Sequence, residues 1–176
     1  MDNGSVYTKN LIDFLTEKKI KFIYKKHNHI DLSEIKNFNS FILSGRRKNN
    51  QEMNALNSKI IKHAVSEQKN LLGICYGAEI LALTIGGTIK KNNVLEKGIQ
   101  EISITKKNPL CSGTIKVFES HNYAISRTNN SLINIANSKN CLFEMIQLEK
   151  HNIFGTQFHP EMSSDGQRII ESFVTL

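Results

Sequence analysis

Residues 70–87 read NLLGICYGAEILALTIGG, and this stretch decides the fold. Its opening residues are almost all apolar, as a strand must be when helices cover both faces of a parallel sheet. Residues 78–84 then predict a short helix, which stops at Gly86-Gly87. Between the two lies Gly73-Ile74-Cys75-Tyr76-Gly77, a G-x-C-x-G pattern at the turn from strand to helix. This pattern is the thiol counterpart of the G-x-S-x-G nucleophile elbow.

Cys75 is therefore a candidate nucleophile. The glycines around it leave room for a sharp turn that holds the sulfur at the carboxyl end of the sheet. The N-terminus of the following helix carries partial positive charge, which favours a thiolate over a thiol. The free N–H groups of the first helical turn can also stabilise an oxyanion. A buried structural cysteine between packing glycines is the competing interpretation of this pattern taken alone.

Working outward, apolar runs alternate with helical patterns in the first half of the chain, and short β patterns follow in the second half. The expected helices cover residues 8–18, 51–68, 78–84 and 167–174. The expected strands cover residues 21–26, 41–43, 70–75, 99–105, 114–119, 132–136, 142–148 and 153–158. This order predicts an α/β, flavodoxin-like doubly wound sheet, mostly parallel, with helices on both faces and an added antiparallel β segment. Since no linker interrupts the chain, we expect a single domain over residues 1–176.

The beginning of the sequence departs from this pattern. A doubly wound domain normally opens with a central strand, but Met1 is followed directly by Asp2-Asn3-Gly4, which predicts a turn. We therefore expect the first strand to be missing or truncated. Either the natural protein has residues upstream of Met1, or another chain fills the gap, because an open gap would leave backbone groups unpaired.

A second candidate pair lies near the other end of the chain. Phe158-His159-Pro160-Glu161 follows the strand pattern of residues 153–158. Residues two apart in extended chain point to the same side, so the Glu161 carboxylate can take one imidazole N–H of His159 and leave the other nitrogen free for a thiol. In isolation such a segment is more often a surface turn. With a cysteine elbow in the same chain, it predicts a Cys75–His159–Glu161 triad.

Composition and charge narrow the class of protein. The 176 residues include 23 Lys and Arg against 16 Asp and Glu, a net charge of +7, and 39% of them are hydrophobic. This excludes a disordered or low-complexity chain. No apolar run approaches the roughly 18 residues of a spanning helix, and the N-terminus is polar, so we expect no membrane association and no secretory signal. The lysines are scattered without an aromatic platform, so we expect no nucleic-acid partner.

The three cysteines, Cys75, Cys111 and Cys141, are odd in number and show no metal-ligand spacing. We expect reduced thiols in a cytoplasmic protein, without a bound metal. Cys111 and Cys141 lack an elbow and a partner, so we interpret them as packing residues.

Taken together, these motifs resemble the class I glutamine amidotransferases, and the resemblance extends over essentially the whole chain. Residues 71–87, LLGICYGAEILALTIGG, are similar to the nucleophile segment of that family. Residues 154–174, FGTQFHPEMSSDGQRIIESFV, are similar to its His-Pro-Glu segment with the closing helix. Within the family, DNGSVYT, GICYG and VFESH most resemble the glutaminase subunit of GMP synthetase.

The resemblance implies a mechanism. Cys75 would attack the side-chain amide of L-glutamine, with His159 as base and then acid and Glu161 as its orienter. Water would hydrolyse the thioester, and ammonia would pass to a partner synthetase, with GMP synthesis favoured over anthranilate or aminodeoxychorismate synthesis. The implied oxyanion-hole residues are Arg46 and Tyr76. The implied substrate-binding residues are Gly45, Glu79, Ser120, His121, Asn122 and Tyr123. No cofactor or metal is implied, and the resemblance leaves room for an oligomer.

Two positions depart from the family pattern. Ser44-Gly45-Arg46 stands where the family usually has Ser-Gly-Gly, so the oxyanion loop has less conformational freedom. Glu79 stands where the family usually has Gln. We expect its carboxylate to pair with the α-ammonium group of the substrate and to disfavour a nearby thiolate.

Two alternative functions stay open at this point. One is a stand-alone γ-glutamyl hydrolase with the same triad and a longer amide substrate. The other is a non-catalytic regulatory or binding module on the same fold, against which the presence of Cys75, His159 and Glu161 argues.

Overall fold

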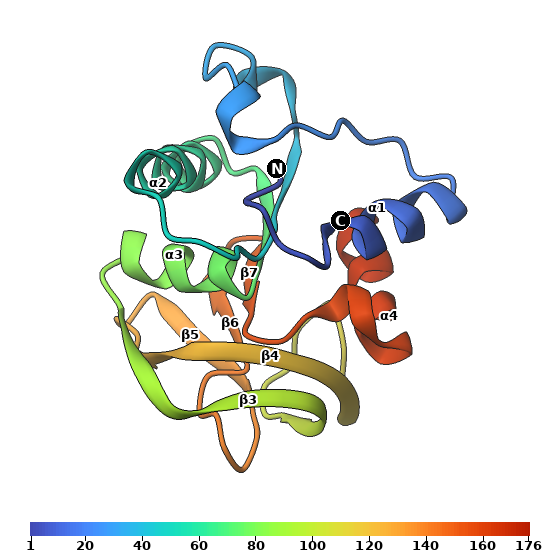
Figure 1. Ribbon diagram of the computed structural model, residues 1–176, viewed down its shortest axis with the longest axis vertical. Coiled ribbons are helices and arrows are strands. Elements are labelled where there is room, and N and C mark those ends of the chain that lie inside the picture. Colours follow the sequence, from blue (N-terminus) through green and yellow to red (C-terminus); the bar gives the residue numbers. More distant parts are fainter.

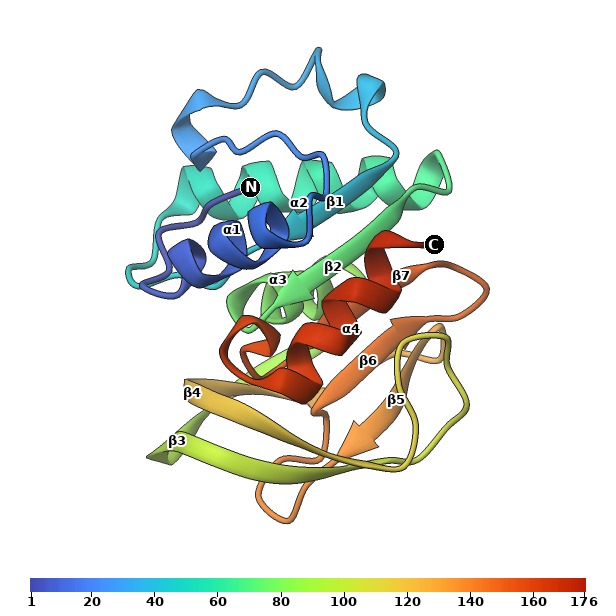
Figure 2. The same ribbon diagram turned by 90° about the vertical axis from the view of Figure 1, so that its right-hand side faces the viewer.

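β2 (Asn70–Ile74) lies in the parallel part of a seven-stranded sheet. The structure is a computed structural model that describes all residues from Met1 to Leu176. The strand order across the sheet is β1-β2-β7-β6-β5-β3-β4 (Figures 1 and 2). The other strands are β1 (Ser40–Leu43), β3 (Thr88–Ile104), β4 (Thr114–Arg127), β5 (Leu132–Asn137), β6 (Met145–Leu148) and β7 (Ile153–Thr156).

Helices cover both faces of the parallel part. The α-helices are α1 (Thr8–Glu17), α2 (Gln51–Ser66), α3 (Tyr76–Thr84) and α4 (Ser164–Val174). Figure 1 shows α2 and α3 on one side of the sheet and α1 and α4 on the other. Leu72 belongs to the core cluster with α1 and α4, whereas Leu71 belongs to the cluster with α2 and α3. This two-sided burial explains why β2 is apolar throughout. None of the helices combines the length and the apolar character that a bilayer crossing demands.

The sheet changes from parallel to antiparallel along its width. β1 pairs with β2 and β2 with β7 in parallel, and all the remaining pairs are antiparallel. The predicted α/β sheet with an added antiparallel segment is thereby confirmed. The antiparallel part is larger than the mostly parallel sheet that the sequence predicts, because four of the six strand pairs are antiparallel. The hairpin of β3 and β4 is longer than the sequence indicated. Residues 88–98 are mostly polar and solvent-exposed, so they carry no alternating pattern, and backbone pairing with β4 holds them.

The strand predicted at residues 21–26 is wrong. Residues 21–24 make no backbone–backbone hydrogen bond, and only Lys26 forms an isolated bridge, with Asp2. The segment between α1 and β1 instead contains the short 3₁₀ turns His27–His29 and Ile35–Asn37 and arches over the β1 edge of the sheet (Figure 2). The apolar pattern of residues 21–26 is real, but no neighbouring strand is present to pair with it.

Close backbone approach fixes α3 against β2 and β1. A Cβ atom at Gly77 would lie 2.3 Å from the Leu43 carbonyl oxygen, and one at Gly73 would lie 2.4 Å from the Gly77 carbonyl oxygen. Neither backbone neighbour can move aside cheaply, so both positions require glycine. This contact places the N-terminus of α3 directly at the carboxyl end of the parallel strands.

We predict that Gly77→Ala destabilises the protein by at least about 2 kcal/mol, because the added methyl overlaps the Leu43 carbonyl. In an unobstructed helix the same change would stabilise by roughly 1 kcal/mol, so the sign of the effect is diagnostic. Urea unfolding of the variant beside Lys62→Ala, an exposed change in α2, measures it. A Gly77→Ala chain as stable as the original would refute the close approach.

Candidate active site

Cys75 stands at the turn between β2 and α3 in a strained conformation. Its φ is 50° and its ψ is −103°, in the region that non-glycine residues rarely occupy. Such a conformation costs about 1–3 kcal/mol and persists only when the surroundings enforce it. Here the Cys75 N–H donates to the Thr156 carbonyl at 2.7 Å, and the Cys75 carbonyl accepts from Ala78 and Glu79 N–H groups, both at 3.0 Å. Strand and helix thus both hold the elbow that the sequence predicts.

His159 and Glu161 form a buried pair just after β7. The imidazole Nδ1 donates to Glu161 Oε1 at 2.8 Å, and both side chains are almost inaccessible to solvent. Because the carboxylate holds the proton on Nδ1, Nε2 keeps its lone pair. The His159 backbone N–H donates to the Phe118 carbonyl at 2.8 Å, and the Tyr7 ring contacts the imidazole edge-on with the ring centres 4.5 Å apart. The imidazole is therefore oriented from three sides.

The loop after β1 reaches the same place. A Cβ at Gly45 would lie 3.0 Å from His159 Cε1, so the loop backbone passes directly against the imidazole ring. The Arg46 guanidinium lies over the Tyr76 ring, 4.1 Å from its centre, and also donates to Asn54 at 3.0 Å. Arg46 is thus not a free cation. It ties the loop to the first residue of α3.

The pKa of the Cys75 thiol differs from the value that the sequence predicts, because it is raised rather than lowered. Burial raises the pKa of the Cys75 thiol well above its usual value, and the carboxylates of Glu79, Glu119 and Glu161 raise it further. The Tyr76 N–H acts in the opposite direction but does not compensate. The expectation that the helix N-terminus favours a thiolate is therefore wrong for the unliganded site, because desolvation and three negative neighbours outweigh the helix dipole.

Glu79 lies one helical turn after Cys75 and is 5% exposed. Burial raises the pKa of its carboxyl group, while Arg46 opposes the shift. The Gln157 side-chain amide lies 3.5 Å from Glu79 Oε1. The Glu79 carboxyl group is therefore buried with a single weak hydrogen bond, and it is close enough for its charge to act on the Cys75 thiol.

The structure does not gather residues 120–123 into one cluster. Ser120 accepts a hydrogen bond from the Tyr7 hydroxyl at 3.2 Å, and His121 is buried. His121 Nδ1 donates to the Tyr123 carbonyl at 2.8 Å, and its Nε2 lies 3.0 Å from the Glu119 carboxylate. Asn122 and Tyr123 expose their side chains on the surface. Within this segment His121 is thus buried and Ser120 half-buried.

Sequence reasoning missed three buried polar residues, Glu119, Glu144 and Gln157. Gln157 Oε1 accepts from the Ile125 N–H at 3.1 Å, and its Nε2 donates to the Tyr123 carbonyl at 3.2 Å. Burial raises the pKa of Glu119 to about 7, and burial together with the charge of Glu119 raises that of Glu144 to about 9. A polar residue inside an apolar strand pattern, as at Gln157, was the signal available in the sequence.

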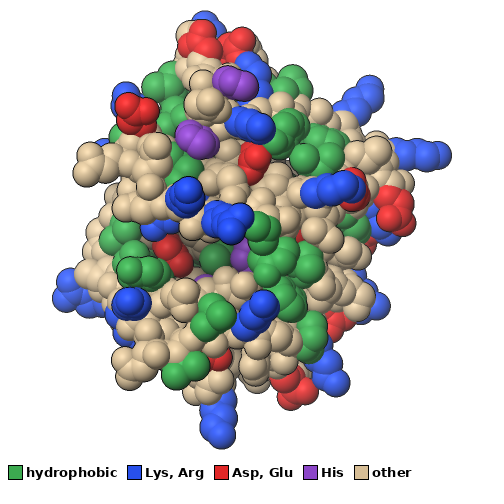
Figure 3. Space-filling model, in the orientation of Figure 1, with side chains coloured by type: hydrophobic (Ala, Val, Ile, Leu, Met, Phe, Trp, Pro, Cys, Tyr) green, Lys and Arg blue, Asp and Glu red, His purple; other side chains and the backbone are tan.

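Lys and Arg side chains form no continuous band on the face of the molecule shown in Figure 3. In the face shown in Figure 3, Lys and Arg are dispersed among acidic and neutral side chains around a central hollow. The dispersed lysines of the sequence therefore stay dispersed on this face of the folded molecule.

A strained cysteine at a strand–helix turn, beside a buried His–Glu pair at the end of the neighbouring strand, is the geometry of α/β proteins that carry a cysteine elbow. The sequence model of the family described as glutamine amidotransferase class-I matches residues 1–175. The chain belongs to the class I glutamine amidotransferases.

Relatives agree with this family. A GMP synthase (glutamine-hydrolyzing) of Prochlorococcus marinus is 32% identical over 182 residues, which cover 99% of this chain and 34% of the relative. A GMP synthase (glutamine-hydrolyzing) of Serratia proteamaculans is 28% identical over 193 residues, which cover 99% of this chain and 35% of the relative. The chain thus spans about a third of the length of these curated relatives.

Solved structures agree as well. A Thermoplasma acidophilum crystal structure, described as that of a GMP synthase subunit, has a TM-score of 0.87 at 27% identity and covers 99% of this chain and 90% of its own. A glutamine amidotransferase from Thermotoga maritima has a TM-score of 0.72 at 19% identity, with 93% of this chain and 75% of its own covered, and supports the fold alone.

The buried carboxyl groups of Glu119 and Glu144 predict how the stability of the folded protein depends on pH. Because the folded-state pKa values of Glu119 and Glu144 are raised, to about 7 and about 9, the folded protein binds more protons than the unfolded chain. Their contribution to stability is present below about pH 4.5 and is lost as the pH rises through these values. We expect Glu144→Gln to gain stability relative to the original chain between pH 5 and pH 9, by about 6 kcal/mol at most, since the rise from 4.5 to about 9 is worth about 1.4 kcal/mol per pH unit.

Urea unfolding of both chains across this pH range gives the difference, in which the titrating groups that do not contact Glu144 cancel, while Glu119 contributes because it interacts with Glu144 directly. A difference that does not change with pH would show that Glu144 titrates normally in the folded protein.

Proposed function

We propose that this chain hydrolyses the side-chain amide of L-glutamine to glutamate and ammonia through a thioester on Cys75. The observation that carries the proposal is the enforced elbow at Cys75 next to the oriented His159–Glu161 pair. The β2–β7 pairing aligns Gly73 with Gly155 and Ile74 with Thr156, so nucleophile and base leave the same edge of the sheet.

The orientation of the His159 ring determines the route of the thiol proton. The thiol is protonated before substrate binds, since burial and nearby carboxylates raise its pKa. As the sulfur attacks the amide carbon, His159 Nε2 accepts the thiol proton, and Glu161 stabilises the imidazolium. The same proton then goes to the leaving nitrogen, and ammonia departs. Water, deprotonated by the imidazole, attacks the thioester and releases glutamate.

Charge develops on the amide oxygen during both attacks. The Tyr76 N–H, in the first turn of α3, is one proposed donor, and the Arg46 N–H, in the loop against His159, is the other. The stacking of Arg46 on Tyr76 supports this pairing, because it connects the two donor segments through their side chains.

Recognition of the amino acid end involves Glu79, Gly45 and the segment from Ser120 to Tyr123. The buried Glu79 carboxylate offers a partner for the substrate's α-ammonium group. Binding that cation beside Glu79 also removes part of the negative field on Cys75. The substrate therefore lowers the pKa of the thiol that attacks it.

Ammonia passes to a synthetase partner of the GMP synthetase kind. The named relatives support this pathway, since both are glutamine-hydrolyzing GMP synthases about three times as long as the region they share with this chain. Residues 1–176 act as one glutaminase domain in the cytoplasm, an environment in which its three free cysteines stay reduced. L-Glutamine and the synthetase are the proposed partners, without nucleic acid or membrane, and the proposal leaves room for an oligomer.

Cys75→Ser should retain glutamine binding and lose turnover by at least roughly a thousandfold, because a hydroxyl of high pKa replaces the thiol. Glutamate release measures turnover, and labelling by diazo-oxo-norleucine measures thiol reactivity. Cys111→Ser is the matched control, since that thiol lies outside the site. An original chain that neither turns over glutamine nor reacts with the label, even beside a synthetase, would establish a non-catalytic module.

Glu79→Gln should raise the KM for glutamine by roughly 10–100-fold, because a charge-assisted hydrogen bond becomes a neutral one. The original chain should hydrolyse glutamine much faster than its N-acetylated analogue, and the variant should discriminate less. Equal rates for the two substrates with the original chain would remove Glu79 from α-ammonium recognition.

Ammonia transfer can be followed with glutamine labelled with ¹⁵N in its side-chain amide. With a GMP synthetase that lacks its own glutaminase part, we expect label in GMP, and Cys75→Ser should abolish it. Label only in free ammonia, with rapid turnover of γ-glutamyl amides, would instead indicate a stand-alone hydrolase.

A further inference from the structure

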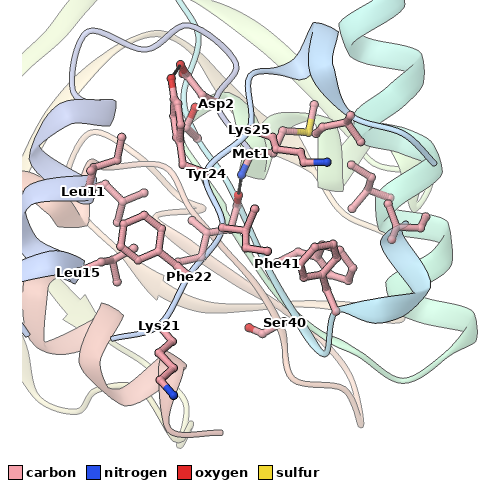
Figure 4. Close-up of a pocket in the computed structure, with 18 of the residues that line it drawn as sticks. Met1, Asp2, Leu11, Leu15, Lys21, Phe22, Tyr24, Lys25, Ser40 and Phe41 are labelled. Carbon is pink, nitrogen blue, oxygen red and sulfur yellow. Dashed lines mark hydrogen bonds between the residues drawn. The ribbon is translucent and has the colours of Figure 1, made fainter. Parts of the chain in front are cut away.

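Glu119, His121 and Glu144 form a buried group of titratable side chains, which we call the carboxyl–imidazole unit. Only 1%, 4% and 1% of their surfaces are exposed. Both oxygens of Glu119, Oε2 of Glu144 and Nε2 of His121 have no hydrogen-bond partner. The unit lies outside the cavity of about 410 Å³ beside β1 (Figure 4), so the missing partners do not come from there. Because buried polar atoms are nearly always paired in folded proteins, four unpaired atoms in one group require an explanation.

The contacts within the unit place Glu119 between an imidazole and a second carboxyl group. His121 Nδ1 lies 2.8 Å from the Tyr123 carbonyl, and it must carry a proton there because a carbonyl only accepts. The other ring nitrogen, Nε2, lies 3.0 Å from Glu119 Oε2. The Glu144 carboxyl group lies within hydrogen-bonding reach of the Glu119 carboxyl group.

Each of these two contacts of Glu119 needs a proton. An imidazole nitrogen and a carboxylate oxygen both present lone pairs when they are deprotonated, and so do two carboxylates, so bare groups would repel each other. Charge leads to the same number. Two carboxylates beside a neutral imidazole carry a charge of −2, and two further protons make the unit neutral, as its burial favours.

The Tyr123 carbonyl connects the unit to the candidate active site. It accepts from His121 Nδ1 and also from Gln157 Nε2, at 3.2 Å. The same Gln157 amide lies 3.5 Å from Glu79 Oε1, and Gln157 Oε1 accepts from the Ile125 N–H at 3.1 Å. Because one carbonyl holds both rings of contacts, the orientation of His121 restrains the Gln157 side chain that contacts Glu79.

We propose that the carboxyl–imidazole unit shares two protons and positions the Gln157 amide against the Glu79 carboxylate. Its three side chains are positioning residues, because they act on Glu79 through Gln157. The consequence for recognition of the substrate's α-ammonium group rests on the proposed function, whereas the shared protons and the order of Gln157 do not.

The pKa values of the two carboxyl groups agree with two held protons. Burial raises the pKa of Glu119 to about 7, and burial together with the charge of Glu119 raises that of Glu144 to about 9. The unit is therefore complete below about pH 7 and loses its protons as the pH rises through these two values. The other titratable groups near it are Glu96 and Lys90 of β3, Cys141 before β6, Cys75 at the elbow and Glu79 of α3.

Carboxyl ¹³C NMR of a chain labelled at its glutamate side chains tests the shared protons without substrate. The signals of Glu119 and Glu144 are assigned by their loss in Glu119→Gln and Glu144→Gln. We expect them to titrate near pH 7 and near pH 9 instead of near pH 4.5. Two signals that both titrate below about pH 5 would overturn the proposal.

Exchange of the Ile125 amide tests the positioning of Gln157, again without substrate, because this N–H donates to Gln157 Oε1. Glu144→Gln keeps an N–H that can donate to Glu119, whereas Glu144→Leu and the smaller Glu144→Ala do not. Relative to the amides of β2, we expect exchange about tenfold faster in the Leu and Ala variants and unchanged in Glu144→Gln. Glu149→Leu is the exposed control. Equal Ile125 exchange in all these chains would overturn the positioning role.

Kinetics connect the unit to substrate recognition. Between about pH 7 and about pH 9, the KM of the original chain for glutamine should rise roughly tenfold relative to that of Glu144→Gln, because the amide of the variant does not lose a proton. The substrate's own amino group titrates equally with both chains and cancels in the ratio. The kcat ratio should change little. A KM ratio that is constant with pH would overturn the link to Glu79.

The experiments separate this inference from the proposed function. A chain without glutaminase activity would refute the proposed function, and the NMR and exchange measurements would still decide between a proton-sharing, positioning unit and an ordinary pair of carboxylates. Glutamine turnover with normally titrating carboxyl groups would refute only the unit.

Discussion

The site depends on one steric constraint, the contact of the α3 backbone with the strands below it. Gly73 and Gly77 bring the helix so close that any side chain at either place would overlap backbone atoms. The chain must then reverse within one residue, and Cys75 takes up the turn at a φ of 50°. The strained cysteine is therefore a consequence of packing, and the hydrogen bond to Thr156 aligns it with the strand that leads to His159. The packing of the core backbone therefore fixes the position of Cys75.

The second organising feature is negative charge around a buried thiol. Glu79, Glu119 and Glu161 all raise the pKa of Cys75, so the empty site favours the neutral sulfur. Each carboxyl group has a separate structural partner: Gln157 for Glu79, His121 for Glu119 and His159 for Glu161. A positive group placed beside these carboxylates would favour the thiolate, because it would offset their negative charge at the sulfur.

Sequence reasoning succeeded where the signal is local. The elbow at Cys75 and the His159–Glu161 pair are short motifs on apolar strands, and the structure has both as expected. It failed where the outcome depends on a distant partner. Residues 21–26 have a strand pattern but no strand beside them, and Glu119 and Glu144 meet only because β4 and the segment before β6 fold together. The position of residues 120–123 likewise depends on β-strand register, which the sequence does not encode in a short window.

The burial of the Cys75 sulfur also bears on its sensitivity to oxidants. Cys75 exposes only 7% of its surface, and its thiol is held in the protonated form. Oxidants such as hydrogen peroxide react with accessible thiolates, so the resting sulfur is a poor target for conversion to sulfenic acid. The raised pKa of the Cys75 thiol thus lowers the reactivity of the resting sulfur toward oxidants.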